Sequence, residues 1–413
     1  MRNRNLTVSV SEAQKIVLSS VSPLTSENVS IMEAYNRVLH QDIISDVMIP
    51  SVDDSAMDGY AIIADDTRGA SKDTPRKLKI TGEIQAGGSI IGKEVSKGTA
   101  IRIMTGAPIP TGADSVIQFE DTEEEAGYVK IFRETVKHNN CRSAGENINK
   151  GDKVLQKGDR LRSADVGILA SLNYKAVRVY KQPAVSIIST GDELADIDEE
   201  SQSGQIRNVN VYTLYSEVKK YGGLPQYVGI AKDTLKDTKE IFLKALKSDV
   251  VISTGGVSMG KYDFVKKIYS DLNIEIQFEW VNVKPGRPCT FAKKDNKLVF
   301  GLPGNPVPTL TSFIQFVRPA LLRLMGAKRI TKPVVNALLE EDIDKQSAKV
   351  HLLLRGYFTI KNNEFYVSPT GNQKPSVLRS MSDANCLIVI PENITKVKAG
   401  DKVSIQLIHH DEI

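Results

Sequence analysis

Near the start of the chain, apolar residues recur every three or four positions, which is the period of an amphipathic helix. Ser11 and Gln14 have the spacing of a capping box, so we expect this helix to begin there. A second pair with the same spacing, Ser30 and Glu33, predicts another helix over 31–39. The apolar positions of the first helix are Ala13, Ile16, Val17 and Val21.

Between residues 51 and 147 the pattern changes to short alternating runs that are separated by Gly, Pro and acidic residues. Such runs are typical of short strands joined by turns. Helical spacing returns in LRSADVGILASL at 161–172. We therefore expect a β-rich module at 51–147, inserted into a discontinuous helical domain made of 1–50 and 148–182.

From 183 to 331 buried-strand runs alternate with helical segments. Repeated β-α units imply right-handed crossovers, so this part predicts a doubly wound, mostly parallel α/β domain. After Pro333 the helical spacing ends, and two strand-like runs flank the turn residues at 361–363. This pattern predicts a small C-terminal β domain, free of helices, over 332–413.

The charge and cysteine content exclude several classes of partner. The 413 residues include 54 basic and 50 acidic side chains, and this net charge of +4 is too small to indicate nucleic acid or a membrane surface. Cys141, Cys289 and Cys386 form no CxxC pair, which suits a reducing cytosol. Without a signal peptide or a long apolar run, we expect a soluble cytoplasmic protein.

Three predicted strands of the α/β domain end in glycine-containing loops, at 188–194, 252–264 and 300–306. Glycine lets the backbone approach a ligand and turn its N–H groups toward an anion. Ligands of open parallel sheets bind beyond the carboxyl ends of the strands, so these loops predict a binding cleft. The second loop lacks both the GxGxxG and the GKS/GKT signatures, which disfavours ordinary dehydrogenase or ATPase sites.

Acidic side chains follow the same strand ends. We expect Glu193, Asp233 and Asp263 to project toward the cleft, where a Mg²⁺ ion near phosphate would compensate their repulsion. The alternative is that each acid begins a helix and is stabilised by its dipole. We favour that alternative for Asp192, and a functional role for Glu193 and Asp263.

Two further groups of residues are candidates. Lys284 and Arg287 flank a Pro-Gly turn in VKPGRP, and two fixed cations can clamp a tetrahedral oxyanion. Asp58 in SAMDGYA and Thr105 in RIMTGAPIP lie in the predicted β-rich module. A turn aspartate and a structural corner explain these last two equally well.

Six motifs in order, SAMDGYA, RIMTGAPIP, STGDEL, STGGVSMGKYDF, VKPGRP and GLPGNP, resemble the molybdopterin molybdenumtransferase family, which includes MoeA and the C-terminal domain of gephyrin. The resemblance covers nearly the whole chain. It implies a homodimer that inserts molybdate into adenylylated molybdopterin, with Mg²⁺-dependent release of AMP. It also implies contact with a molybdopterin adenylyltransferase.

The same resemblance implies roles for individual residues. Asp58 and Thr105 would reach into a site on another subunit, and Asp233 would position substrate or hold Mg²⁺. Glu193 and Asp263 would be the metal ligands. The residues implied for oxyanion and pterin-phosphate binding are Lys284, Arg287, Gly255, Gly256, Ser258, Gly304, Arg355 and Ser376.

The sequence departs from the family pattern at two positions. Asn147 stands where relatives often have an acid, and Arg287 stands where many have Lys. Two other functions stay open at this point. One is a molybdopterin adenylyltransferase, which the 183–331 domain also resembles, and the other is a non-catalytic molybdopterin-binding scaffold.

Overall fold

The computed structural model describes residues 6–200, 202–255 and 262–408, with the backbone alone at 262–264. The chain folds as two compact units. The first contains Met1–His40, Gly158–Ser163 and Ala176–Ile413, and the second contains Gln41–Lys157 and Ala164–Lys175. Within the described ranges, none of the helices is long and apolar enough to cross a membrane.

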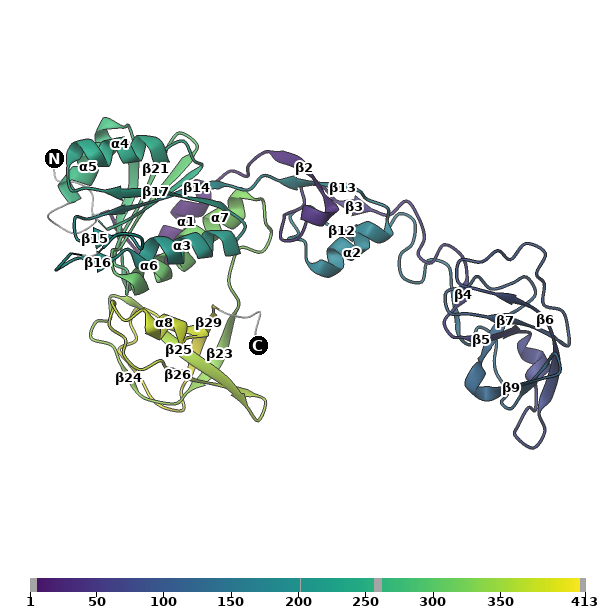
Figure 1. The fold of residues 1–413 in the computed structure, drawn as a ribbon. Helices are drawn as coiled ribbons and strands as arrows, with labels where there is room; N and C mark the ends of the chain where they lie inside the picture. The colour runs from purple at the N-terminus through teal and green to yellow at the C-terminus, as the bar shows by residue number, and fades with distance from the viewer. Residues whose placement is uncertain (1–5, 201, 256–261, 409–413) are drawn as a thin grey trace. The chain divides into compact units, whose positions relative to one another are not determined.

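A seven-stranded sheet forms the centre of the first unit (Figure 1). Its pairings are parallel except for the two made by β21, so the sheet is mostly parallel, as the β-α pattern predicted. Across the sheet the order is β1 (Thr7–Val8), β19 (Glu275–Val281), β21 (Pro288–Lys294), β22 (Lys297–Leu302), β18 (Val250–Thr254), β14 (Ala184–Thr190) and β17 (Leu224–Ala231).

Helices cover both faces of this sheet. Val250 and Ile252 pack into one apolar core, whereas Val251 between them packs into the other, as expected for a strand buried on both sides. The first core is covered by α1 (Val10–Ser19), α3 (Val209–Lys220), the π-helical turn η4 (Phe313–Val317) and α7 (Arg318–Leu324). Helix α6 (Pro306–Ser312) instead contributes Val307 and Leu310 to a separate apolar cluster shared with the C-terminal domain. The second is covered by α4 (Leu235–Ala245) and α5 (Tyr262–Asp271).

The π-helical turn between α6 and α7 follows from a proline. Pro319 has no N–H, so the carbonyl of Gln315, four residues earlier, loses its helical donor. The side-chain amide of Gln14 on α1 approaches that carbonyl at 3.4 Å and the Gln315 side-chain oxygen at 3.2 Å. Gln315 in turn donates to Gln406 of the C-terminal sheet at 2.6 Å, which links three parts of the unit.

The C-terminal domain is a six-stranded sheet with its own apolar core. Asn362 and Asn363 have φ values of 50° and 63°, the left-handed turn geometry that the hairpin prediction requires. The strands in order are β20 (Val283–Lys284), β25 (His351–Lys361), β26 (Glu364–Pro369), β23 (Val334–Leu339), β29 (Lys402–Leu407) and β27 (Cys386–Ile390). The short pair β24 (Ile343–Asp344) and β28 (Lys396–Val397) and helix α8 (Arg379–Ser382) complete the domain.

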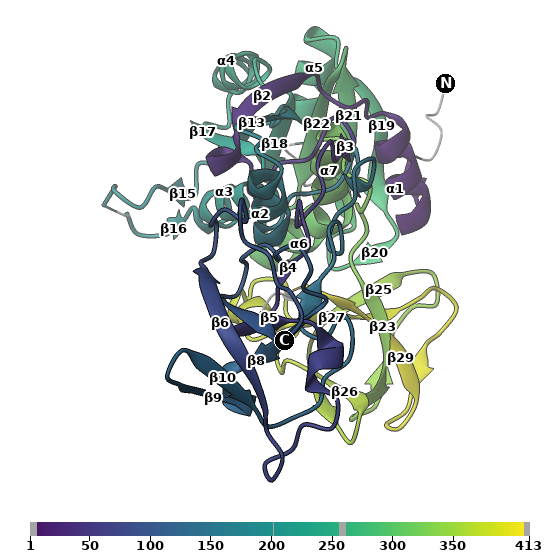
Figure 2. The same cartoon turned by 90° about the vertical axis from the view of Figure 1, so that its right-hand side faces the viewer.

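The second unit is built on another six-stranded sheet. Its strands β6, β8, β9 and β10 are labelled in Figure 2. Its order is β8 (Ser115–Gln118), β5 (Gly59–Ile62), β7 (Thr99–Ile103), β6 (Arg76–Ile84), β10 (Tyr128–Ile131) and β9 (Thr122–Glu125). The remaining elements are β3 (Ile43–Ile44), β4 (Asp54–Ser55), β11 (Cys141–Arg142), β12 (Lys153–Leu155), η2 (Ala64–Thr67), η3 (Phe119–Asp121) and α2 (Ser163–Ser171).

Three local predictions were wrong. The first helix is capped by Ser9 with Glu12, and not by Ser11 with Gln14, because Ser9 is the last residue with extended backbone. The helix expected over 31–39 is only a 3-10 turn, since Asn36 adopts a left-handed φ of 64° and ends helical geometry. The C-terminal domain was expected to lack helices but contains α8.

The 3-10 turn, η1 (Ile31–Glu33), follows strand β2 (Ser26–Ser30), which pairs with β13 (Ala176–Tyr180). In the loop after β14 a short parallel pair forms between β15 (Leu194–Ala195) and β16 (Ile206–Arg207).

Candidate active site

The three glycine-containing loops begin side by side at the carboxyl ends of β14, β18 and β22. A Cβ atom on Gly255, whose φ is +80°, would lie 2.6 Å from the carbonyl oxygen of Thr190. Gly304 approaches Gly255 from the other side, because a Cβ atom added to Gly304 would lie 3.5 Å from the Gly255 Cα. Gly255 therefore lets the first and third loops close around the second, and a larger residue would separate them.

Asparagines that the sequence patterns did not single out hold these loops in place. Asn210, near the start of α3, donates from Nδ2 to the Gly304 carbonyl at 2.7 Å. Its Oδ1 is buried and, among the described residues, has no hydrogen-bond partner. Asn208 accepts a hydrogen bond from Ser189 on β14 at 3.0 Å. No local signal marked these two residues, because RNVN fits an ordinary helix start and the contact of Asn210 with Gly304 joins distant parts of the sequence.

Two acids meet at the ends of β14 and β17. The Asp233 backbone N–H donates to the Asp192 carboxylate at 3.0 Å, and the Asp192 N–H lies 3.5 Å from the Asp233 carboxylate. The helix-start role that we favoured for Asp192 is wrong, because the loop continues into β15 and not into a helix. Asp192 instead positions Asp233 at the sheet edge.

Glu193 also lies at this edge. Its exposed side chain folds back over Gly191, and a Cβ at Gly191 would lie 2.5 Å from Glu193 Oε1. Gly256, Ser258 and the Asp263 side chain lie outside the described residues, and so their roles stay predictions. In the described part of the chain no three His, Cys, Asp or Glu side chains are grouped closely enough to hold a metal ion.

A cavity of about 540 Å³ adjoins the third loop. Pro303, Asn305 and Pro308 of that loop and of α6 line it, together with residues of the VKPGRP turn and of the C-terminal domain. Four of its lining residues are basic, and one, Asp344, is acidic. The basic residues are Lys284, Arg287, Lys345 and Arg355. The predominance of cations favours an anionic occupant, and we call this cavity the basic pocket.

Arg355 is the most unusual of these cations, because its side chain is buried and has no acidic partner in the described structure. The residue is 1% exposed. Its Nε donates to Ser380 Oγ at 3.1 Å, and an Nη approaches the Lys374 carbonyl at 3.5 Å. Burial of the guanidinium lowers the pKa of Arg355 to about 10. A buried cation with neutral partners is well suited to meet an incoming oxyanion.

Lys284 and Arg287 occupy the more open side of the basic pocket. Lys284 belongs to β20, which pairs with β25 of the C-terminal domain, so its backbone is fixed by that sheet. Both side chains are exposed, and the described residues give them no ion pair. Lys345 differs, because its ammonium donates to the carbonyls of Val350 and Pro391 at 2.9 and 2.6 Å. The first two cations are therefore available to a ligand.

Ser376 is not among the residues that line the basic pocket, although its neighbour Pro375 is. Ser376 is exposed. The hydroxyl that contacts Arg355 is that of Ser380, which is 3% exposed. Its proximity could not be read from the sequence, because it depends on the short helix α8.

Asp58 and Thr105 are brought together within the second unit. The backbone N–H and the hydroxyl of Thr105 both donate to Asp58 Oδ1, at 2.7 and 2.8 Å. These hydrogen bonds, the backbone one first, lower the pKa of Asp58 and keep the carboxylate charged. Both residues are exposed, so the pair presents one fixed negative charge to solvent.

The second unit also contains a polar cavity of about 430 Å³ beside Asn147. Asp54 and Arg142 line it and form a two-point ion pair with distances of 2.7 and 2.9 Å. Asn147 is held through its backbone N–H, which donates to the Ile49 carbonyl at 3.0 Å. Asn147 therefore lines a cavity in which Arg142 already has a carboxylate partner.

Comparisons with known proteins cover nearly all of the chain. Family models match at residues 8–173 (MoeA N-terminal region, domain I and II), 186–323 (probable molybdopterin binding domain) and 336–408 (MoeA C-terminal region, domain IV). A molybdopterin molybdenumtransferase of Staphylococcus epidermidis is 36% identical over 97% of this chain and 95% of its own. One from Staphylococcus aureus is 35% identical over 98% and 96%.

A crystal structure of a molybdopterin biosynthesis MoeA protein from Pyrococcus horikoshii superimposes with a TM-score of 0.81 at 32% identity. It covers 97% of this chain and 100% of that one. Fold and matches together define a multidomain α/β transferase of molybdenum cofactor biosynthesis, with a molybdopterin-binding type of domain at its centre. The chain belongs to the molybdopterin molybdenumtransferase family.

Proposed function

We propose that the protein inserts molybdenum from molybdate into adenylylated molybdopterin and releases AMP. The observation that carries the proposal is the segment Pro303–Asn305. Its Gly304 packs against Gly255 among the strand-end loops, and its two flanking residues line the basic pocket. A phosphate-bearing pterin at the loops and an oxyanion in the pocket would therefore share one wall.

The chemistry requires two anions to meet, and their repulsion must be offset by fixed cations. Arg355, Lys284 and Arg287 would hold molybdate from two domains, with the buried guanidinium at the inner end of the pocket. The exposed pair would neutralise charge as the oxyanion approaches the dithiolene end of the pterin. Backbone at Gly255 and Gly304 would admit the pterin phosphate.

We propose Mg²⁺ as the cofactor. Magnesium in phosphoryl sites is usually held by one or two carboxylates together with substrate phosphate oxygens, so a complete protein cage is not required. We propose Glu193 and Asp263 as its ligands, and Asp233 would position substrate or hold the metal, while Asp192 fixes the backbone of Asp233. When bound, the metal would polarise the phosphate bridge whose cleavage releases AMP.

We further propose that the protein acts as a cytoplasmic homodimer, in which Asp58 and Thr105 of one subunit serve the site of the other. The three cysteines are free, and Cys289 and Cys386 are buried, which agrees with a reducing compartment. Adenylylated molybdopterin would be received from a molybdopterin adenylyltransferase.

The test is an assay with purified protein, adenylylated molybdopterin, molybdate and Mg²⁺, in which AMP release is followed over time. We expect the protein to release AMP only when adenylylated molybdopterin, molybdate and Mg²⁺ are all present. ATP consumption with free molybdopterin would instead indicate an adenylyltransferase. Binding of the pterin without AMP release under any of these conditions would indicate a scaffold and contradict the proposal.

A further inference from the structure

A second cavity lies on the opposite side of α6 from the basic pocket. Its volume is about 280 Å³. Pro308 lines the basic pocket and Leu310 lines the second cavity, because residues two apart in a helix point in nearly opposite directions. The segment 373–378 is shared in the same way, with Gln373 at the basic pocket and Leu378 at the second cavity. We call this second cavity the α3 pocket.

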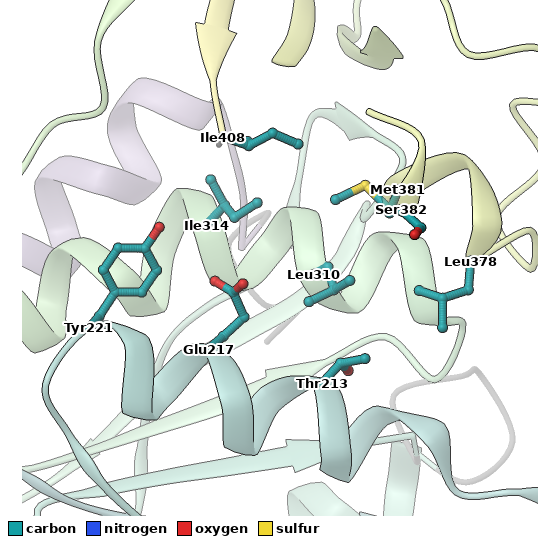
Figure 3. Close-up of a pocket in the computed structure, with 9 residues that line it drawn as sticks. All are labelled: Thr213, Glu217, Tyr221, Leu310, Ile314, Leu378, Met381, Ser382 and Ile408. Atoms are coloured by element: carbon teal, nitrogen blue, oxygen red, sulfur yellow. The ribbon is translucent and has the colours of Figure 1, made fainter. Parts of the chain in front are cut away.

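The α3 pocket is mostly apolar. Leu310 and Ile314 form one wall, and Met381 of α8 and Leu378, the residue just before α8, contribute from the other side (Figure 3). Ile408 closes one end, after strand β29. An apolar surface of this kind binds a hydrophobic group by removing it from water.

One carboxylate faces this apolar space. Glu217 projects from α3 toward Leu310 and Ile314, and its oxygens point into the cavity (Figure 3). Within the described residues the Glu217 carboxylate forms no hydrogen bond and no ion pair. Burial raises the pKa of Glu217, although cations in the vicinity partly oppose the rise. Buried charges normally have a charged or hydrogen-bonding partner, so this carboxylate is suited to receive one from a ligand.

Two of the three cations that lower the pKa of Glu217 donate to backbone carbonyls. Arg318 donates to the Ile330 carbonyl at 2.8 Å and lies over the ring of Tyr221, 4.9 Å from its centroid. Lys332 donates to the Ile408 carbonyl at 3.1 Å and lies 5.6 Å from the same ring. Lys220 lies 5.9 Å from that ring. These groups lower the pKa of Glu217 from a distance, and so the carboxylate can accept a donor from inside the cavity.

We propose that the α3 pocket is a binding site for a small organic ammonium ion with an apolar body, held by the Glu217 carboxylate at one end and by the Leu310, Ile314 and Met381 side chains around it. A cavity of about 150 Å³ accommodates a benzene molecule, so this larger volume suits one six-membered ring with a short arm. A ligand seated here would touch the reverse side of two segments that line the basic pocket.

Binding of 2-phenylethylammonium to the full-length protein, followed by isothermal titration calorimetry and ligand-observed NMR, tests this proposal. We expect a Kd of about 1 mM or tighter, as befits a fragment of nine non-hydrogen atoms. Glu217→Gln keeps the shape and removes the charge, so it should weaken binding at least about tenfold. The matched control Glu240→Gln, an exposed acid on α4, should leave the Kd unchanged.

Uncharged 2-phenylethanol should bind at least about tenfold more weakly than the ammonium ion to the wild type, and equally to wild type and Glu217→Gln. A second variant, Met381→Trp, fills the cavity and should abolish binding of both probes. Equal affinity of wild type and Glu217→Gln for the ammonium ion would overturn the proposal. Undiminished binding to a folded Met381→Trp protein would overturn it as well, because the probe would then be bound elsewhere.

Discussion

Replacing Arg355 by Met should weaken molybdate binding without weakening the fold. Arg355 is 1% exposed, its partners are the neutral Ser380 hydroxyl and Lys374 carbonyl, and burial lowers its pKa by about 2.5 units to about 10. At 1.36 kcal/mol per pKa unit, this shift sets an upper bound of about 3 kcal/mol on the cost of the charged form, because solvent in the adjoining basic pocket screens the guanidinium. A bound oxyanion would recover much of that cost.

The sign of the stability effect follows from the lowered pKa. In a window that begins at about pH 10, the unfolded chain holds the Arg355 proton more tightly than the folded protein does. The destabilisation is therefore present in full below pH 10 and is relieved as the pH rises through this window. At neutral pH, Arg355→Met removes a buried cation and leaves a side chain of similar length, so the free energy of unfolding should stay the same or increase.

Molybdate binding should respond in the opposite direction. A charge-assisted hydrogen bond contributes about 1.5–3 kcal/mol, which corresponds to a loss of roughly 10- to 150-fold in affinity. Calorimetric titration with molybdate and thermal unfolding, both at pH 7, measure the two effects. Arg379→Met is the matched control, since the Arg379 side chain is 88% exposed on α8 and pairs only loosely with Asp383 at 3.7 Å. Unchanged molybdate affinity in a folded Arg355→Met protein would show that Arg355 does not bind the oxyanion.

Three further predictions concern single side chains. Lys284→Ala should lower the rate of AMP release at least about tenfold without changing the melting temperature, because this exposed cation lines the basic pocket. An unaltered rate would show that Lys284 is not part of the site. Thr105→Val removes one of two donors to Asp58, so NMR titration should show a higher Asp58 pKa, and an unchanged pKa would contradict the assigned hydrogen bond. Gly255→Ala should lower the free energy of unfolding by more than about 1 kcal/mol, since its Cβ would lie 2.6 Å from the Thr190 carbonyl oxygen. Gly304→Ala is the milder control, because its Cβ would meet only a 3.5 Å contact. Equal melting temperatures of the two variants would count against the close packing of these loops.

The sequence predicted those parts of the fold that depend on regular spacing. Strands buried on both faces, such as Val250–Thr254, read as continuous apolar runs, and the Asn362–Asn363 turn carries its own conformational preference. The helix predicted over 31–39 does not form, although its apolar residues have helical spacing, because Asn36 adopts a left-handed backbone conformation. Val38 and Leu39 bury themselves through bridges to Arg160 and Val179 instead.

The site was predictable only where a motif marks a backbone requirement. Gly255 and Gly304 stand where loops must approach closely, and that need is visible in the sequence. The burial of Arg355 beside Ser380, and the exposure of Ser376, depend on how α8 and β25 pack, which no local pattern encodes. Asn210 was missed for the same reason, since its contact with Gly304 joins residues 94 positions apart.

The central claim is that the oxyanion binds in the basic pocket, beside the glycine loops. Crystals of the protein soaked in molybdate, with diffraction data collected at the molybdenum absorption edge, locate that ion directly by its anomalous scattering. We expect a peak between Lys284, Arg287 and Arg355. A dominant peak in the polar cavity beside Arg142, with none in the basic pocket, would contradict this claim.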